Sequence, residues 1–141
     1  MLVRHPDWQK LLAAYLKVAE QRDFERGECD CCTFALDAIK TMTGVDLLPS
    51  LRGAYSTGNG ARRYIAEQKC SSLEDLARRL AVQYRLEEIP AMFSMVGDVA
   101  VVKTGDIGQS LAIRWTRGFT TKAVGKRALV MVADPIIVWR V

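Results

Sequence analysis

The first 90 residues place most apolar side chains at the spacing of an α-helix. In residues 6–22 they recur at i, i+3 and i+4, at Trp8, Leu11, Leu12, Tyr15, Leu16 and Ala19. This spacing predicts a helix with one buried face. Residues 31–43 carry the same pattern, and residues 60–69 and 72–86 predict a short and a longer helix. The segment 44–60 is polar and rich in glycine, which is typical of a long connection.

Polar residues beside these runs mark the expected helix ends. Asp30 directly precedes residues 31–43, where an aspartate accepts a hydrogen bond from a backbone N–H of the first turn. We therefore expect Asp30→Ala to cost about 1 kcal/mol of stability. Gly44 predicts the end of this helix. Ser71 and Glu74 match a capping box, which predicts the start of the next long helix.

From residue 91 the pattern changes to short runs rich in β-branched and aromatic side chains. The runs are VAVVK, SLAIRW, FTTKAV, ALVMVA and IIVWRV. Turn residues separate them, including Gly105-Asp106 and Asp134-Pro135. These runs predict an antiparallel sheet of about five strands. Helices followed by strands indicate the α+β class, so we expect one domain over residues 1–141, with a helical part (1–90) and a sheet part (91–141).

Charge is unevenly placed along the chain, whose formal net charge is +4. Residues 97–141 carry seven basic and three acidic side chains, whereas residues 1–96 are balanced. A basic surface can bind nucleic acid, and such binding would weaken steeply with salt. No aromatic platform or recognition-helix pattern accompanies the charge. We therefore interpret the basic excess as a solvated sheet face and expect no nucleic-acid partner.

The size and hydrophobicity of the chain fit a folded domain. It has 141 residues, half of them hydrophobic, which is enough to form a core. No apolar run reaches the roughly 20 residues of a membrane span. The first ten residues lack the apolar segment of a secretory signal peptide. We therefore expect no membrane span, no signal peptide, and cysteines that stay reduced.

Cys31 is the candidate nucleophile, because it opens the helix expected over residues 31–43. The helix dipole and free N–H groups at a helix N-terminus favour an anion, so the pKa of a thiol there tends to fall. A cysteine in a first turn also occurs simply as a small apolar core residue. The local sequence leaves both interpretations open.

The cysteines are also candidate metal ligands. Their number, four, is enough for zinc or an iron–sulfur cluster, at positions 29, 31, 32 and 70. The C-x-C-C spacing differs from that of a zinc knuckle, in which two residues separate the first pair. Neighbouring helical side chains also point about 100° apart. We therefore expect no metal and no other cofactor.

Several short motifs stand in an order that a known family shares. They are Trp8, Asp30-Cys31, Thr43-Gly44-Val45-Asp46, Arg52-Gly53-Ala54-Tyr55, Gly97-Asp98-Val99 and Trp139-Arg140-Val141. In this order they resemble phage tail-associated relatives of the NlpC-type cell-wall peptidases, which are papain-like. The resemblance covers nearly the whole chain. It implies a papain-like fold, in which N-terminal helices pack on a C-terminal antiparallel sheet.

The same resemblance implies a catalytic site with one substitution. Cys31 matches the nucleophile and follows Asp30, the expected helix cap. The family's base is a histidine at the start of the second core strand, and Ser110 occupies that position here. A serine hydroxyl does not act as a base near neutral pH, and a cysteine nucleophile needs one. The only histidine, His5, comes from the other end of the chain and serves as a base only in a new arrangement.

Two functions follow from this resemblance. The first is a structural or assembly component of a phage tail tip, built on a degenerate NlpC-type fold. It implies assembly in the host cytoplasm, a place in the virion tail, and hub, distal tail or fibre proteins as partners. The alternative is an active cysteine peptidase or amidase that cleaves peptidoglycan during phage entry, with Cys31 as nucleophile. The missing histidine favours the first function.

Overall fold

The computed structural model describes residues 2–104 and 107–141. These residues form four α-helices, one short 3-10 helix and six strands. The α-helices are α1 (Trp8–Ala19), α2 (Cys31–Thr43), α3 (Gly58–Glu67) and α4 (Leu73–Gln83). The 3-10 helix is η1 (Ala91–Phe93). The strands are β1 (Glu87–Ile89), β2 (Val99–Val102), β3 (Ser110–Arg114), β4 (Phe119–Thr121), β5 (Val130–Val132) and β6 (Pro135–Arg140).

Side-chain caps fix the starts of α2, α3 and α4. Asp30 accepts from the backbone N–H groups of Cys32 and Thr33, which confirms it as the N-cap of α2. Gly44, with φ 77°, ends α2 as expected. The expected cap of α4 is one residue off, because Ser72 rather than Ser71 accepts from the N–H of Asp75.

All six strands pair antiparallel, in the order β1-β6-β2-β3-β4-β5. The chain is therefore α+β, as predicted. The sheet has one more strand than the roughly five expected, since β1 lies within the part expected to be helical. Two of the three residues of β1 are glutamates, which have weak β propensity. Pairing with β6, rather than local sequence, makes this segment a strand.

The sheet is strongly curled. β5 and β6 are separated by three strands in the sheet but by only residues 133 and 134 in the sequence. Such a short link spans about 10 Å, so the sheet bends until the end of β5 meets the start of β6. The enclosed face is filled mainly by small or β-branched side chains, namely Ala100, Val102, Ala112, Val138, Ile89 and Phe119. The expected turn at Gly105-Asp106 lies outside the described residues.

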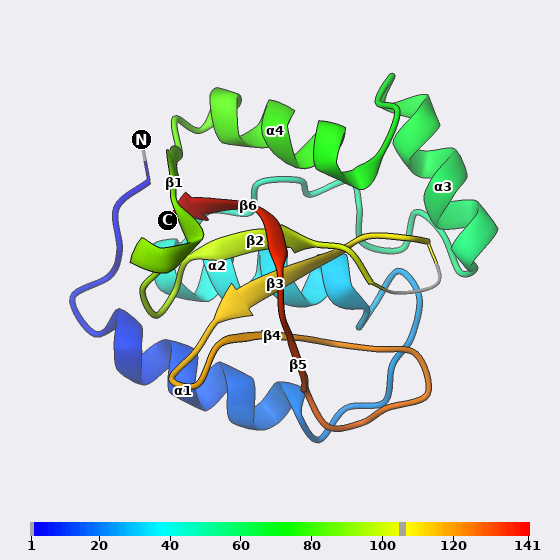
Figure 1. The fold of residues 1–141 in the computed structure, drawn as a ribbon. Coiled ribbons are helices and arrows are strands. Elements are labelled where there is room, and N and C mark those ends of the chain that lie inside the picture. Colours follow the sequence, from blue (N-terminus) through cyan, green and yellow to red (C-terminus); the bar gives the residue numbers. More distant parts are fainter. Residues whose placement is uncertain (1, 105–106) are drawn as a thin grey trace.

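The other face of the sheet carries the main core. α2 lies behind β2 and β3 in the view of Figure 1. Alternate residues of β2, β3 and β6 point to it, as the two-residue period of a strand requires. α2 packs against β3 and against α1. α4 covers the end of the sheet near β2, where the core includes Trp139 of β6. This arrangement holds the N-terminus of α2 next to the start of β3.

Candidate functional site

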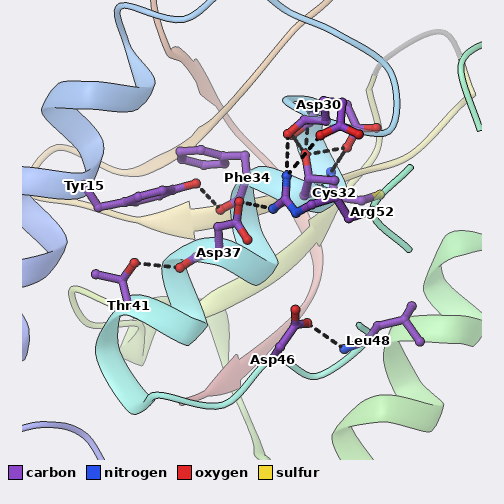
Figure 2. A network of polar contacts seen from close by, with 11 residues as sticks. Tyr15, Asp30, Cys32, Phe34, Asp37, Thr41, Asp46, Leu48 and Arg52 are labelled. Atoms are coloured by element: carbon purple, nitrogen blue, oxygen red, sulfur yellow. Dashed lines mark hydrogen bonds and ion pairs between the residues drawn. The ribbon is translucent and has the colours of Figure 1, made fainter. Parts of the chain in front are cut away.

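Asp30 is the centre of a buried polar network at the N-terminus of α2 (Figure 2). Its side chain is 1% exposed. Oδ1 accepts from the N–H groups of Cys32 at 3.0 Å and Thr33 at 2.9 Å. Oδ2 accepts from the N–H of Gly27 at 2.9 Å and from the hydroxyl of Tyr55 at 2.6 Å. The carboxylate thus joins three separate segments of the chain.

The loop around Gly27 touches the Arg52-Tyr55 segment directly. The Gly27 carbonyl accepts from the N–H of Gly53 at 2.9 Å. Gly27 has φ 82°, and a Cβ there would lie 2.1 Å from the Tyr55 carbonyl oxygen. Only glycine fits a backbone approach this close. Burial raises the pKa of Tyr55, so its hydroxyl stays protonated and donates to Asp30.

Arg52 links the Arg52-Tyr55 segment to the side of α2 by hydrogen bonds. Its guanidinium bonds to the carboxylate of Asp37 and donates to the Glu28 carbonyl at 2.8 Å (Figure 2). The hydrogen bond to Asp37 raises the pKa of Arg52. The Arg52-Gly53-Ala54-Tyr55 motif therefore braces the start of α2.

Cys31 lies at the head of α2 with its thiol almost fully buried. Its side chain is 4% exposed, and its Sγ is 3.8 Å from that of Cys32. The hydrogen bond from Cys32 lowers the pKa of Cys31, and it outweighs the opposing effect of burial. The backbone of Leu111 and the hydroxyl of Ser110 act in the same direction as Cys32. The same hydrogen bond, together with burial, raises the pKa of Cys32.

Cys31 borders a cavity of about 220 Å³ between α2 and the sheet. The wall combines hydroxyl, cationic and apolar side chains, from Phe24, Arg26, Thr104, Ile107, Ser110, Thr121, Lys122, Ala123, Val124 and Val130. None of these described lining residues is a histidine, aspartate or glutamate. A thiolate in this cavity therefore lacks an acid–base partner among the residues that the structure describes.

Lys122 does not fill that role, although it lines the cavity. Its side chain is 1% exposed, and Nζ donates to the carbonyls of Ala19, Arg22 and Arg127. Burial lowers the pKa of Lys122, but all three ammonium protons are used in these bonds. Lys122 therefore ties β4 to the end of α1.

His5 lies at the opposite end of α2 from Cys31. Its backbone N–H donates to the Met42 carbonyl at 2.7 Å, and its Nδ1 accepts from the N–H of Asp7. Eleven residues of helix separate Met42 from Cys31, which is about 16 Å. The structure therefore does not bring His5 to the thiol.

Ser110, by contrast, stands beside Cys31. It is the first residue of β3, is buried, and lines the same cavity. Its Oγ lies 3.3 Å from the Thr104 carbonyl. The position that the NlpC-type resemblance assigns to the histidine thus faces the position it assigns to the nucleophile.

Residues of three further motifs, Trp8, Asp98 and Arg140, belong to a second polar network, around Asp98. This carboxylate is 0% exposed and pairs with Arg4 at 3.5 Å and Arg140 at 3.3 Å. It also accepts from the N–H of Met95 at 2.7 Å. The Arg4 guanidinium lies over the ring of Trp8, 4.0 Å from its centroid. Asp98 and its two arginines therefore join both ends of the chain to the start of β2.

The cysteines lie in the protein interior, and several basic side chains have partners within the same chain. All four cysteines are free and buried. Within residues 2–104 and 107–141, no group of three or more histidine, cysteine or acidic side chains is arranged to hold a metal ion. Three basic side chains of the C-terminal third bind other parts of the same chain. Lys122 donates hydrogen bonds to backbone carbonyls, and Arg127 and Arg140 form ion pairs with Asp23 and Asp98. No described helix is long and apolar enough to cross a membrane.

Sequence reasoning missed Cys32, Thr121 and Lys122 as members of this site. Cys32 follows Cys31 directly, but the angle of about 100° between neighbouring helical side chains gave no reason to expect their sulfurs 3.8 Å apart. Thr121 and Lys122 carried no signal, because only the curl of the sheet brings β4 to the head of α2.

Comparisons with known proteins give one family. Residues 3–141 match the family described as Domain of unknown function (DUF6950). The match spans nearly the whole sequence, so the chain belongs to this family. Comparison with the curated proteins and with the solved structures gave no match.

Proposed function

We propose that this DUF6950 member is a structural or assembly component of a phage tail tip. We further propose that it is built on an NlpC-type, papain-like fold that no longer hydrolyses peptide bonds. On this proposal it acts in the virion tail, and its partners are the hub, distal tail or fibre proteins. The phage origin and the fold family rest on the motif resemblance described above.

The observation that carries the loss of hydrolysis is the pairing of Cys31 with Ser110. The thiol and the start of β3 lie side by side, as a papain-like nucleophile and base would. The group at the base position is a hydroxyl, and the only histidine lies at the far end of α2. Without a base, neither nucleophile activation nor protonation of the leaving amine is supplied.

A partner surface is supported by an exposed apolar segment after β1. Met92 is 83% exposed, Phe93 62% and Met95 61%. Exposed methionine and phenylalanine side chains within four residues are typical of a surface that another protein covers. None of these three residues lines the cavity beside Cys31, so the assembly role and the cysteine cavity can be tested by separate mutations.

The hydrolysis test compares three variants on purified muropeptides. Cleavage is measured as the release of new amine groups. We expect none from the wild type or from Cys31→Ser, since neither has both a thiol nucleophile and a base beside it. Ser110→His restores a base beside the thiol, and we expect cleavage to appear in this variant only. Cleavage by the wild type that Cys31→Ser abolishes would overturn the proposal.

The assembly test measures binding to purified tail-tip proteins. We expect Phe93→Ser to weaken binding by about tenfold or more, as truncation of an aromatic anchor does. Val82→Ser is the matched control, because Val82 is 80% exposed on α4. Equal binding by both variants would exclude the 92–95 segment as the partner surface.

An active cysteine peptidase or amidase is the second candidate function. One observation favours it: the pKa of Cys31 is lowered by its hydrogen bond with Cys32. A lowered pKa raises the thiolate fraction near neutral pH. The muropeptide assay distinguishes the two functions, because only this one predicts turnover by the wild type.

A further inference from the structure

The two thiols at the head of α2 are placed for joint binding of one atom. The Sγ atoms of Cys31 and Cys32 are 3.8 Å apart in the reduced protein. Metal–sulfur bonds are about 2.3 Å long, so this separation corresponds to an angle of about 110° at a shared central atom. That angle is close to tetrahedral, so both sulfurs can bond to one centre with little movement.

The surroundings restrict which centre fits. Among the described residues, no group of three histidine, cysteine or acidic side chains is arranged to hold a metal ion. The neighbouring carboxylate, Asp30, is already engaged in hydrogen bonds through both oxygens. Zinc in proteins takes at least three such ligands, so a structural zinc is disfavoured. Two thiol sulfurs without oxygen or nitrogen ligands suit a soft, thiophilic atom. The other bonds of that atom would be to groups of the ligand itself, and not to protein side chains.

The cavity beside Cys31 provides room for such a substituent. Its volume is about 220 Å³, and an apolar cavity of about 150 Å³ is enough to bind benzene. Phe24, Ile107 and Val130 contribute apolar surface to its wall. Cys32 lies on the other side of the pair and lines a separate apolar cavity, and Ile107 lines both. A bound atom would therefore sit at the boundary of the two cavities.

We propose that Cys31 and Cys32 form a two-thiol site for soft, thiophilic ligands of the trivalent organoarsenical type. This inference is independent of the proposed function, since chelation needs no general base. In the reaction the hydrated arsenical, with two As–OH groups, reacts with both thiols. Two As–S bonds form, two As–O bonds break, and each thiol proton leaves with a hydroxyl as water. Arsenic stays trivalent, so no oxidant or reductant takes part.

The experiment uses phenylarsine oxide on the full chain. The background variant carries Cys29→Ser and Cys70→Ser, so that only the pair remains. We expect one arsenical per chain by native mass spectrometry, with loss of both titratable thiols. Cys31→Ser and Cys32→Ser on this background should each bind about 100-fold or more weakly, because the second As–S bond is then absent.

Two results would overturn the proposal. Affinity in the Cys32→Ser variant equal to that of the pair would show attachment through Cys31 alone. Binding by the urea-unfolded chain but not by the folded chain would show that the fold withholds the pair. Melting temperatures of all variants are measured alongside, and Cys32→Ala replaces Cys32→Ser if the serine variant does not fold.

Discussion

Asp30 and Asp98 are both buried aspartates that precede a core element, yet they are neutralised in different ways. In the part of the chain that the structure describes, Asp30 accepts hydrogen bonds from neutral donors, namely backbone N–H groups and hydroxyls. Asp98 faces two guanidinium groups, whose side chains are 20% and 37% exposed. The first site relies on directional hydrogen bonds at a helix N-terminus, and the second on charge pairing near the surface.

This difference separates two uses of a buried carboxylate. At Asp30 most donors are backbone N–H groups with fixed positions, so the network sets the shape of the loop that leads into α2 and Cys31. At Asp98 the partners are long, flexible side chains, which hold the chain ends but allow small shifts. We therefore expect changes in backbone geometry to reduce the stability contributed by the Asp30 network. Added salt should reduce mainly the stability contributed by the Asp98 network.

The largest effect is expected for Asp30→Ala. Loss of the helix cap costs about 1 kcal/mol. The buried N–H of Gly27 and hydroxyl of Tyr55 also lose their acceptor, at about 1 to 3 kcal/mol each. We expect a total of about 3 to 7 kcal/mol in urea unfolding, rather than the roughly 1 kcal/mol that capping alone predicts. A loss of only about 1 kcal/mol would show that Gly27 and Tyr55 find other partners.

Gly27→Ala tests the geometry of the same network. Its Cβ would meet the Tyr55 carbonyl oxygen at 2.1 Å, in a backbone conformation with φ 82°. Gly44→Ala is the matched control, since Gly44 has φ 77° but nothing within 4 Å of an added Cβ. We expect Gly44→Ala to cost about 1 kcal/mol and Gly27→Ala about 3 kcal/mol or more. Equal unfolding free energies would mean that the loop around Gly27 yields without strain.

Asp98→Ala is expected to cost about 2 to 3 kcal/mol, below the usual range for fully buried pairs, since both arginines reach solvent. The free energy of unfolding is measured at low salt and at about 1 M salt, where the Debye length is about 3 Å. The cost of Asp98→Ala should shrink at high salt, whereas the cost of Asp30→Ala should not. The same salt dependence in both variants would remove the distinction between the two sites.

The smallest effect concerns the ionisation of Cys31, which follows Asp30 at the start of α2. Cys32→Ala removes the hydrogen bond that contributes most to lowering the pKa of Cys31. Losing a donor to the thiolate favours the neutral thiol, so the pKa rises. We expect the pH midpoint of Cys31 alkylation, followed by mass spectrometry, to move upward in this variant. Cys32→Ser keeps a hydroxyl donor, so the midpoint should rise less in this variant. An unchanged midpoint in both variants would show that the hydrogen bond with Cys32 does not lower the pKa of Cys31.

The sequence predicted elements whose signals are local. α2 spans the residues expected from Asp30, the apolar face and Gly44. α1 ends at Ala19 rather than at residue 22. Residues 20–22 are polar and exposed, so they do not extend the buried apolar face of the helix. β1 was missed because its strand conformation depends on pairing with β6, which lies about 50 residues later.

The site was predictable only in part, for a similar reason. A cap at Asp30 and a thiol at Cys31 follow from one stretch of sequence. The bonds from Gly27 and Tyr55 to Asp30 depend on a long connection folding back, which periodicity does not encode. The place of Ser110 beside Cys31 was expected from the family resemblance, and the approach of Lys122 follows from sheet curvature alone.

The position of β6 in the sheet has a consequence for the order of folding. β6 lies between β1 and β2, although it is the last strand in the sequence. During synthesis β1 and β2 are exposed before their shared neighbour leaves the ribosome. The sheet therefore closes only when the final strand inserts, a step that depends on contacts distant in sequence and is accordingly slow. A chain stalled before Pro135 would present the unpaired edges of β1 and β2, so the nascent chain is most prone to aggregation until β6 has been synthesised.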